Sequence, residues 1–68
     1  MSKAFKLIEV VGTSNESYAV AINSAVEQAR KSISGLGWFE VTDLRGAILE
    51  KGLEYQATVK IGFRLRDE

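Results

Sequence analysis

The spacing of apolar and polar positions divides the chain into four stretches. Residues 3–11 are rich in β-branched residues and partly alternate, and Gly12 follows them, which predicts a first strand. Residues 38–50 and 54–66 predict two further strands, and Lys51-Gly52 supplies the turn of a hairpin between them. In the last strand the apolar residues share one parity and the polar residues the other, so we expect it to bury a single face.

Between the first two predicted strands, apolar residues recur at steps of three and four, as they do on one face of a helix. This stripe consists of Tyr18, Ile22, Ala25, Val26, Ala29, Ile33 and Leu36. Thr13 and Glu16 match the capping-box pattern, which places the helix N-terminus at Thr13. Gly35 follows the last turn, where a left-handed residue commonly closes a helix. The pattern therefore predicts an amphipathic helix of about five turns, whose alanine-rich face permits close approach to a sheet.

The resulting order of elements is β-α-β-β, which is an α+β arrangement. A right-handed crossover makes the first two strands parallel, and the third then lies between them, antiparallel to both. We expect a three-stranded sheet wrapped around one helix, in a single domain that spans residues 1–68. The other face of the sheet meets solvent or another subunit.

Trp38 is the residue that does not fit this arrangement. If Phe39 and Val41 pack on the helix, the alternation of the strand turns Trp38 outward. The same test turns Gln56 outward, so we expect the two side chains close together on one face of the hairpin. Trp38 then plugs an oligomer interface, returns to the core after a bulge, or forms a platform for a planar ligand. An aromatic face beside an amide suits a flat heterocycle with its own donors and acceptors.

Composition narrows the chemistry that the chain can perform. It contains no Cys and no His, which excludes disulfides, thiolate nucleophiles, the usual general base and nearly all catalytic zinc sites. No catalytic constellation is found, so we expect no enzyme. Nine basic and nine acidic residues balance, which argues against binding to nucleic acid. No apolar run approaches the roughly 20 residues that cross a bilayer, and no targeting segment is visible, so we expect no membrane partner and a cytoplasmic location.

The length of the chain, 68 residues, limits the stability of a lone subunit. Below roughly 70–80 residues a single hydrophobic core seldom gives a folding stability above about 3–5 kcal/mol unless a disulfide, a bound metal or oligomerisation adds to it. Because disulfides and Cys/His metal sites are excluded, oligomerisation is the remaining common means of stabilisation, and we expect a stable homo-oligomer.

Charged residues near the hairpin give weaker indications of a site. Asp43 and Arg45 share a parity and could polarise a ligand, although exposed charges on a strand are usually only solvated. A basic row on the last strand could hold a phosphate or neutralise carboxylates across an interface. It consists of Lys60, Arg64 and Arg66.

Five short motifs, taken together, resemble the dodecin family of small flavin-binding proteins. They are Val11-Gly12-Thr13-Ser14, Trp38-Phe39-Glu40-Val41, Arg45-Gly46, Tyr55-Gln56 and Gly62-Phe63-Arg64-Leu65. Each motif is short, but their joint order and spacing cover nearly the whole chain. The resemblance implies a hollow, spherical homododecamer of tetrahedral symmetry, with the helices outside and the sheets lining the interior.

The resemblance also implies a binding site, in which paired flavins lie between the Trp residues of two symmetry-related subunits. Trp38 matches the stacking indole, and Gln56 matches the amide that hydrogen-bonds the edge of the isoalloxazine. Arg45 matches a basic position near the ribityl or phosphate tail. Asp43 matches a position that makes a polar contact to the ribityl chain, and Arg64 matches one that assists in binding the phosphate.

The function implied is storage and buffering of flavin, with quenching of its photochemistry. FMN is the favoured ligand because Arg45 and the basic row could meet a phosphate, and riboflavin and FAD are the other candidates. Some members of the family also hold coenzyme A or ions. The alternative is therefore an oligomeric shell, or an ion- or coenzyme A-binding protein, in which Trp38 only seals the interface.

Overall fold

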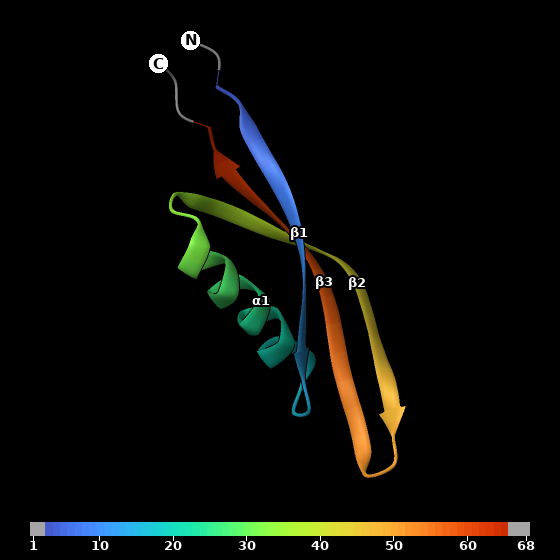
Figure 1. Cartoon of the computed structure of the whole chain (residues 1–68). Helices are drawn as coiled ribbons and strands as arrows, with labels where there is room; N and C mark the ends of the chain where they lie inside the picture. The colour runs from blue at the N-terminus through green and yellow to red at the C-terminus, as the bar shows by residue number, and fades with distance from the viewer. Residues whose placement is uncertain (1–2, 66–68) are drawn as a thin grey trace.

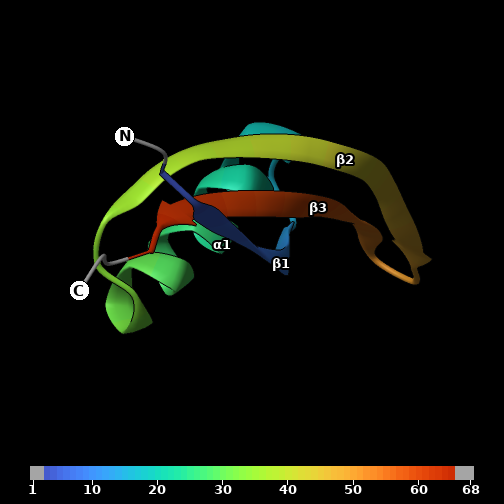
Figure 2. The same cartoon turned by 90° about the horizontal axis from the view of Figure 1, so that it is seen from above.

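The computed structural model describes residues 3–65 (Figure 1). Its elements are β1 (Phe5–Ser14), α1 (Tyr18–Ser32), β2 (Leu36–Leu49) and β3 (Gly52–Arg64). The three strands form one sheet in the order β1-β3-β2, and both neighbouring pairs are antiparallel. β1 and β2 therefore run parallel, as the crossover rule predicted. Figure 2 shows the curved sheet with α1 against one face, so the predicted β-α-β-β fold is confirmed.

The N-terminus of α1 differs from the prediction. The N-cap is Ser17, whose side chain accepts a hydrogen bond from the Val20 backbone N–H at 3.1 Å. Thr13, the predicted cap, still belongs to β1, where it pairs with Gln56. The capping-box prediction was wrong because β1 stays paired with β3 as far as Ser14, beyond the predicted end of the strand.

The C-terminus of α1 also lies earlier than the periodic stripe suggested. Ile33 is the C-cap, and its backbone N–H donates to the Ala29 carbonyl at 2.9 Å. Gly35 has the predicted left-handed backbone, with φ of +78°, but in the connection after the cap. The helix has 15 residues, or about four turns instead of five.

The hairpin turn is displaced by one residue from the predicted position. Leu49 pairs with Gly52, so Glu50 and Lys51 form the loop between β2 and β3. Gly52 has φ of +151°, a conformation that side chains disfavour. The predicted end of the last strand at Arg66 lies outside the described residues.

The core forms where the alanine face of α1 meets the middle of β3. Its buried residues are Ala21, Ala25, Ala29, Ala57, Val59 and Ile61. Gly12 of β1 allows this close approach, since a Cβ there would meet the Ala21 carbonyl oxygen and lie 2.9 Å from the Ala25 backbone nitrogen. The predicted alanine-rich packing face is confirmed.

Much of the apolar surface is not covered by this core. The exposed large apolar residues are Phe5, Leu7, Val11, Val20, Trp38, Phe39, Leu44, Ile48, Leu49, Leu53 and Leu65. A monomeric protein of this size seldom exposes so much, so the pattern supports the expected assembly of several copies. The one helix within residues 3–65, α1, is too short and too polar to span a membrane.

Candidate ligand-binding face

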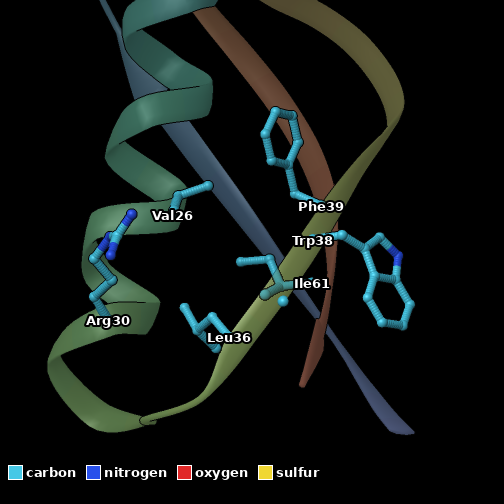
Figure 3. A pocket seen from close by; sticks show the side chains of 7 residues that line it. Val26, Arg30, Leu36, Trp38, Phe39 and Ile61 are labelled. Atoms are coloured by element: carbon cyan, nitrogen blue, oxygen red, sulfur yellow. The ribbon is translucent and has the colours of Figure 1, made fainter. Parts of the chain in front are cut away.

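Trp38 lies on the face of the sheet opposite α1, which we call the outer face. In Figure 3 its indole points away from the helix, whereas Phe39 and Ile61 lie on the helix side of the sheet. Phe39 pairs with Ile61, which is buried, and Trp38 pairs with Gly62. Trp38 is 45% exposed as a residue. The predicted outward orientation of Trp38 is confirmed, and its return to the core after a bulge is excluded.

A β-bulge at Thr42 interrupts the alternation of β2. Val41 pairs with Val59 and Asp43 with Thr58, so Thr42 is the extra residue between them. Its hydroxyl donates a hydrogen bond to the Thr58 carbonyl at 3.3 Å. Because one residue is inserted, every side chain of β2 beyond the bulge changes face.

This change of face brings two sequence-predicted residues onto the outer face. Strict alternation would turn Asp43 and Arg45 to the helix side, together with Phe39. Beyond the bulge, however, Arg45 lies directly opposite Gln56, whose side chain points outward, and Asp43 lies one outward position away. The predicted common face of Asp43 and Arg45 is therefore confirmed, and the bulge makes it the outer face.

Within one chain, Trp38 and Gln56 share the outer face but do not lie close together. Trp38 is paired with Gly62, and Gln56 precedes Gly62 by six positions on β3. At about 3.3 Å per residue this is about 20 Å along the strand. The expectation that the two side chains are neighbours was wrong, because parity determines the face of a strand and not the distance along it.

Arg64 lies at the same end of the outer face as Trp38. Its partner on β1 is Phe5, and it follows Gly62 by two positions on β3. The candidate residues thus form two groups at opposite ends of the outer face. Trp38 and Arg64 form one group, and Asp43, Arg45 and Gln56 form the other.

The basic row does not act as one patch along β3. Lys60 lies directly opposite Glu9 on one side and Glu40 on the other, so its charge is flanked by two carboxylates. Arg66 lies outside the described residues. Among the described members, Arg64 is the candidate for a phosphate.

Gln56 already has a polar partner in the isolated chain. Its side-chain amide donates to a carboxylate oxygen of Glu54 at 3.0 Å. The side chain is half-buried, and this bond orients its amide on the outer face. Its carbonyl oxygen has no hydrogen-bond donor among the described residues, so it can accept a bond from a ligand.

A small hollow between α1 and the start of β2 was not found by sequence reasoning. It has a volume of about 120 Å³ and is lined by Val26, Arg30, Leu36, Gly37, Trp38, Phe39 and Ile61. Ligand pockets typically hold about 300–1,000 Å³, so this hollow is too small for a tricyclic ring. It also lies on the side of β2 from which the indole points away (Figure 3). Within residues 3–65 no group of three or more His, Cys, Asp or Glu could hold a metal ion.

Known proteins resemble this chain over nearly its whole length. The sequence model of the family Dodecin matches residues 4–66. A dodecin from Thermus thermophilus is 47% identical over 68 residues, which cover 98% of this chain and 99% of that protein. A crystal structure of a Thermus thermophilus protein is 46% identical, with a TM-score of 0.92 over 98% of this chain and 100% of that one.

A more distant relative is described with a different ligand. It is a calcium dodecin from Mycobacterium tuberculosis, whose crystal structure contains a novel calcium-binding site. It is 27% identical, with a TM-score of 0.83, and the match covers 96% of this chain and 94% of that one.

Proposed function

Because this chain belongs to the dodecin family, we propose that it is a flavin-binding storage protein. Dodecameric assembly is known for the family, whose members are small binding proteins. The observation that carries the proposal is the exposed Trp38 indole on the outer face. A large aromatic plane left free by its own subunit suits stacking on a planar ring.

A complete site requires more than one subunit. Trp38 and Gln56 lie about 20 Å apart along β3 in one chain, which is too far for both to contact one isoalloxazine. We infer that Trp38 of one subunit meets the polar group of another, with paired flavins between the indoles of symmetry-related copies. This explains why the two groups of candidate residues share a face but lie at opposite ends of it.

The polar group supports recognition of both the ring and its tail. Gln56 would hydrogen-bond the edge of the isoalloxazine, because its amide can both donate and accept hydrogen bonds. Arg45, directly opposite Gln56, would lie near the ribityl or phosphate tail, with Asp43 on the ribityl hydroxyls. Arg64 contributes positive charge at the other end of the face. Two arginines favour FMN over riboflavin, since a phosphate binds guanidinium groups in a bidentate manner.

The chemistry of these side chains suits storage instead of turnover. An indole in contact with an excited isoalloxazine can donate an electron and take it back, which quenches emission and leaves no net reaction. The chain contains no His and no Cys that would transfer protons or attack a substrate. Stacking therefore shortens the reactive lifetime of the flavin without consuming it.

Titration of FMN with the assembled protein tests this function. We expect the flavin fluorescence to fall strongly and to saturate at a flavin concentration equal to that of the chains. Riboflavin, titrated in parallel, should bind more weakly because it lacks the phosphate. Unaltered FMN emission, especially with binding of coenzyme A or calcium, would instead support a shell or ion-binding protein in which Trp38 only seals the interface.

Replacement of Gln56 by Ala should weaken FMN binding by about 1–3 kcal/mol, because the ring edge loses a hydrogen-bond partner in a desolvated site. The dissociation constant is read from the fluorescence titration. Gln28→Ala is the matched control, since it removes the same amide from an exposed position on α1. An affinity equal to that of the unmodified protein in Gln56→Ala would mean that this amide does not face the ligand.

A further inference from the structure

The indole of Trp38 reaches across the middle strand of the sheet. It starts from β2, where Trp38 is paired with Gly62 of β3. Its ring centroid lies 5.1 Å from that of Phe5 on β1, with an angle of 67° between the ring planes. β1 and β2 are the two outer strands. The side chain therefore covers β3 and meets a second aromatic ring in a T-shaped contact.

Gly62 provides the surface on which the indole lies. A Cβ at this position would be 2.5 Å from Cη2 and 2.6 Å from Cε2 of Trp38, and would also meet Cζ2 between them. Since Cη2 and Cε2 are almost as near as Cζ2 itself, the Cβ would stand above the face of the six-membered ring and not beside its edge. One face of the indole thus rests on the β3 backbone, and the opposite face points away from the subunit.

The backbone conformation of Gly62 does not by itself require glycine. Within residues 3–65, the glycines with positive φ are Gly35 and Gly52, and Gly62 is not among them. What any other residue would add at Gly62 is a Cβ inside the indole. The absence of a side chain therefore serves the position of Trp38.

Phe5 restrains the same ring from the side. The angle of 67° is an edge contact, the geometry that aromatic pairs prefer over a face-to-face sandwich. Such a contact opposes rotation of the indole on its glycine surface. Both aromatic side chains remain about half exposed, Phe5 at 47% and Trp38 at 45%, so the contact does not cover the outward face of the indole.

We propose that Gly62 and Phe5 are positioning residues that hold the Trp38 indole flat on the sheet as a preformed stacking surface. A ring already held in its bound orientation loses less conformational freedom when a planar ligand arrives. The identity of that ligand rests on the proposed flavin function, whereas the position of the indole on Gly62 and against Phe5 is a property of the subunit itself.

Gly62→Ala tests the proposal in the assembled protein. The added methyl group should lift or rotate the indole, because an overpacked site forces neighbouring side chains out of their preferred rotamers. We expect a change in the near-ultraviolet circular dichroism of Trp38, the chain's single tryptophan, without ligand. FMN affinity should fall about tenfold, with weaker quenching at saturation, because a displaced indole loses part of its stacking on the ring. Gly37→Ala is the matched control, because its Cβ would lie 3.6 Å from the Gly62 carbonyl oxygen, an ordinary contact.

Phe5→Leu provides a second test that keeps an apolar side chain and removes the aromatic edge. The indole dichroism should decrease and FMN affinity should fall, by less than in Gly62→Ala. An unchanged tryptophan signal and unchanged FMN affinity in Gly62→Ala overturn the proposal, and the same result in Phe5→Leu overturns it should Gly62→Ala fail to assemble. If the unmodified protein does not bind FMN, the proposed flavin-binding function is wrong. A changed tryptophan dichroism in the variants would still support the role of Gly62 and Phe5 in positioning the indole.

Discussion

Replacement of Trp38 by Ala is expected to abolish most FMN affinity and most quenching while the oligomer survives. The variant removes the plane on which the ring stacks and the indole that donates the electron. Stacking of a planar ring on an aromatic side chain contributes about 1–3 kcal/mol, so the dissociation constant should rise by about 5- to 150-fold for each flavin, which loses the one indole it stacks on. The measurement is the FMN fluorescence titration, combined with light scattering to determine the mass of the assembly.

Trp38→Phe separates the two roles of the indole. A smaller aromatic plane should restore part of the affinity, but phenyl is a much poorer electron donor, so bound flavin should remain more fluorescent. Disassembly of Trp38→Ala into smaller species would contradict the prediction. That result would favour the interpretation in which Trp38 only seals the interface.

Gly12→Ala should have the largest effect on stability. The added Cβ would meet the Ala21 carbonyl oxygen and the Ala25 backbone nitrogen, and neither can move without displacing α1 from β1. Overpacking costs typically 1–3 kcal/mol and occasionally more. Because the colliding atoms are backbone, we expect a loss of about 3 kcal/mol or failure of the subunit to fold. Urea unfolding followed by circular dichroism measures the change.

The comparison requires equal protein concentrations, because the stability of an oligomer depends on them. Gly37→Ala serves again as the control, since its Cβ makes only an ordinary contact with the neighbouring strand. An unfolding midpoint of Gly12→Ala within error of that control would show that α1 does not need its close approach to β1.

The sequence was a good guide wherever a local pattern corresponds to a local geometry. The right-handed crossover rule was sufficient to predict the sheet order, and alternation in β3 with the alanine stripe of α1 was sufficient to predict the covered face. The same alternation turned Trp38 outward, because Phe39 beside it had to face the core. The helix start was a different case, since Thr13 and Ser17 both have side chains that cap helices. Pairing of β1 with β3 through Ser14 selected the second of them.

The arrangement of the candidate site depended on features that no short stretch of the sequence contains. The bulge at Thr42 is defined by which residues of β3 oppose β2, and it alone brings Asp43 and Arg45 to the face of Gln56. The separation of Trp38 from Gln56 likewise follows from the register of two long strands. The alternation of residues within a strand specifies which face a side chain lies on. The pairing between distant strands specifies which side chains become its neighbours along the sheet.

By itself, then, the sequence determined the order of the elements, the faces that α1 and β3 bury and the exposure of a single indole. These follow from the periods of helix and strand, which hold between neighbouring residues of an uninterrupted element. Only the tertiary structure decided which polar residues share that face and how far from the indole they lie. Register and bulges arise from contacts between segments remote in the chain, and their energies are not contained in either segment alone.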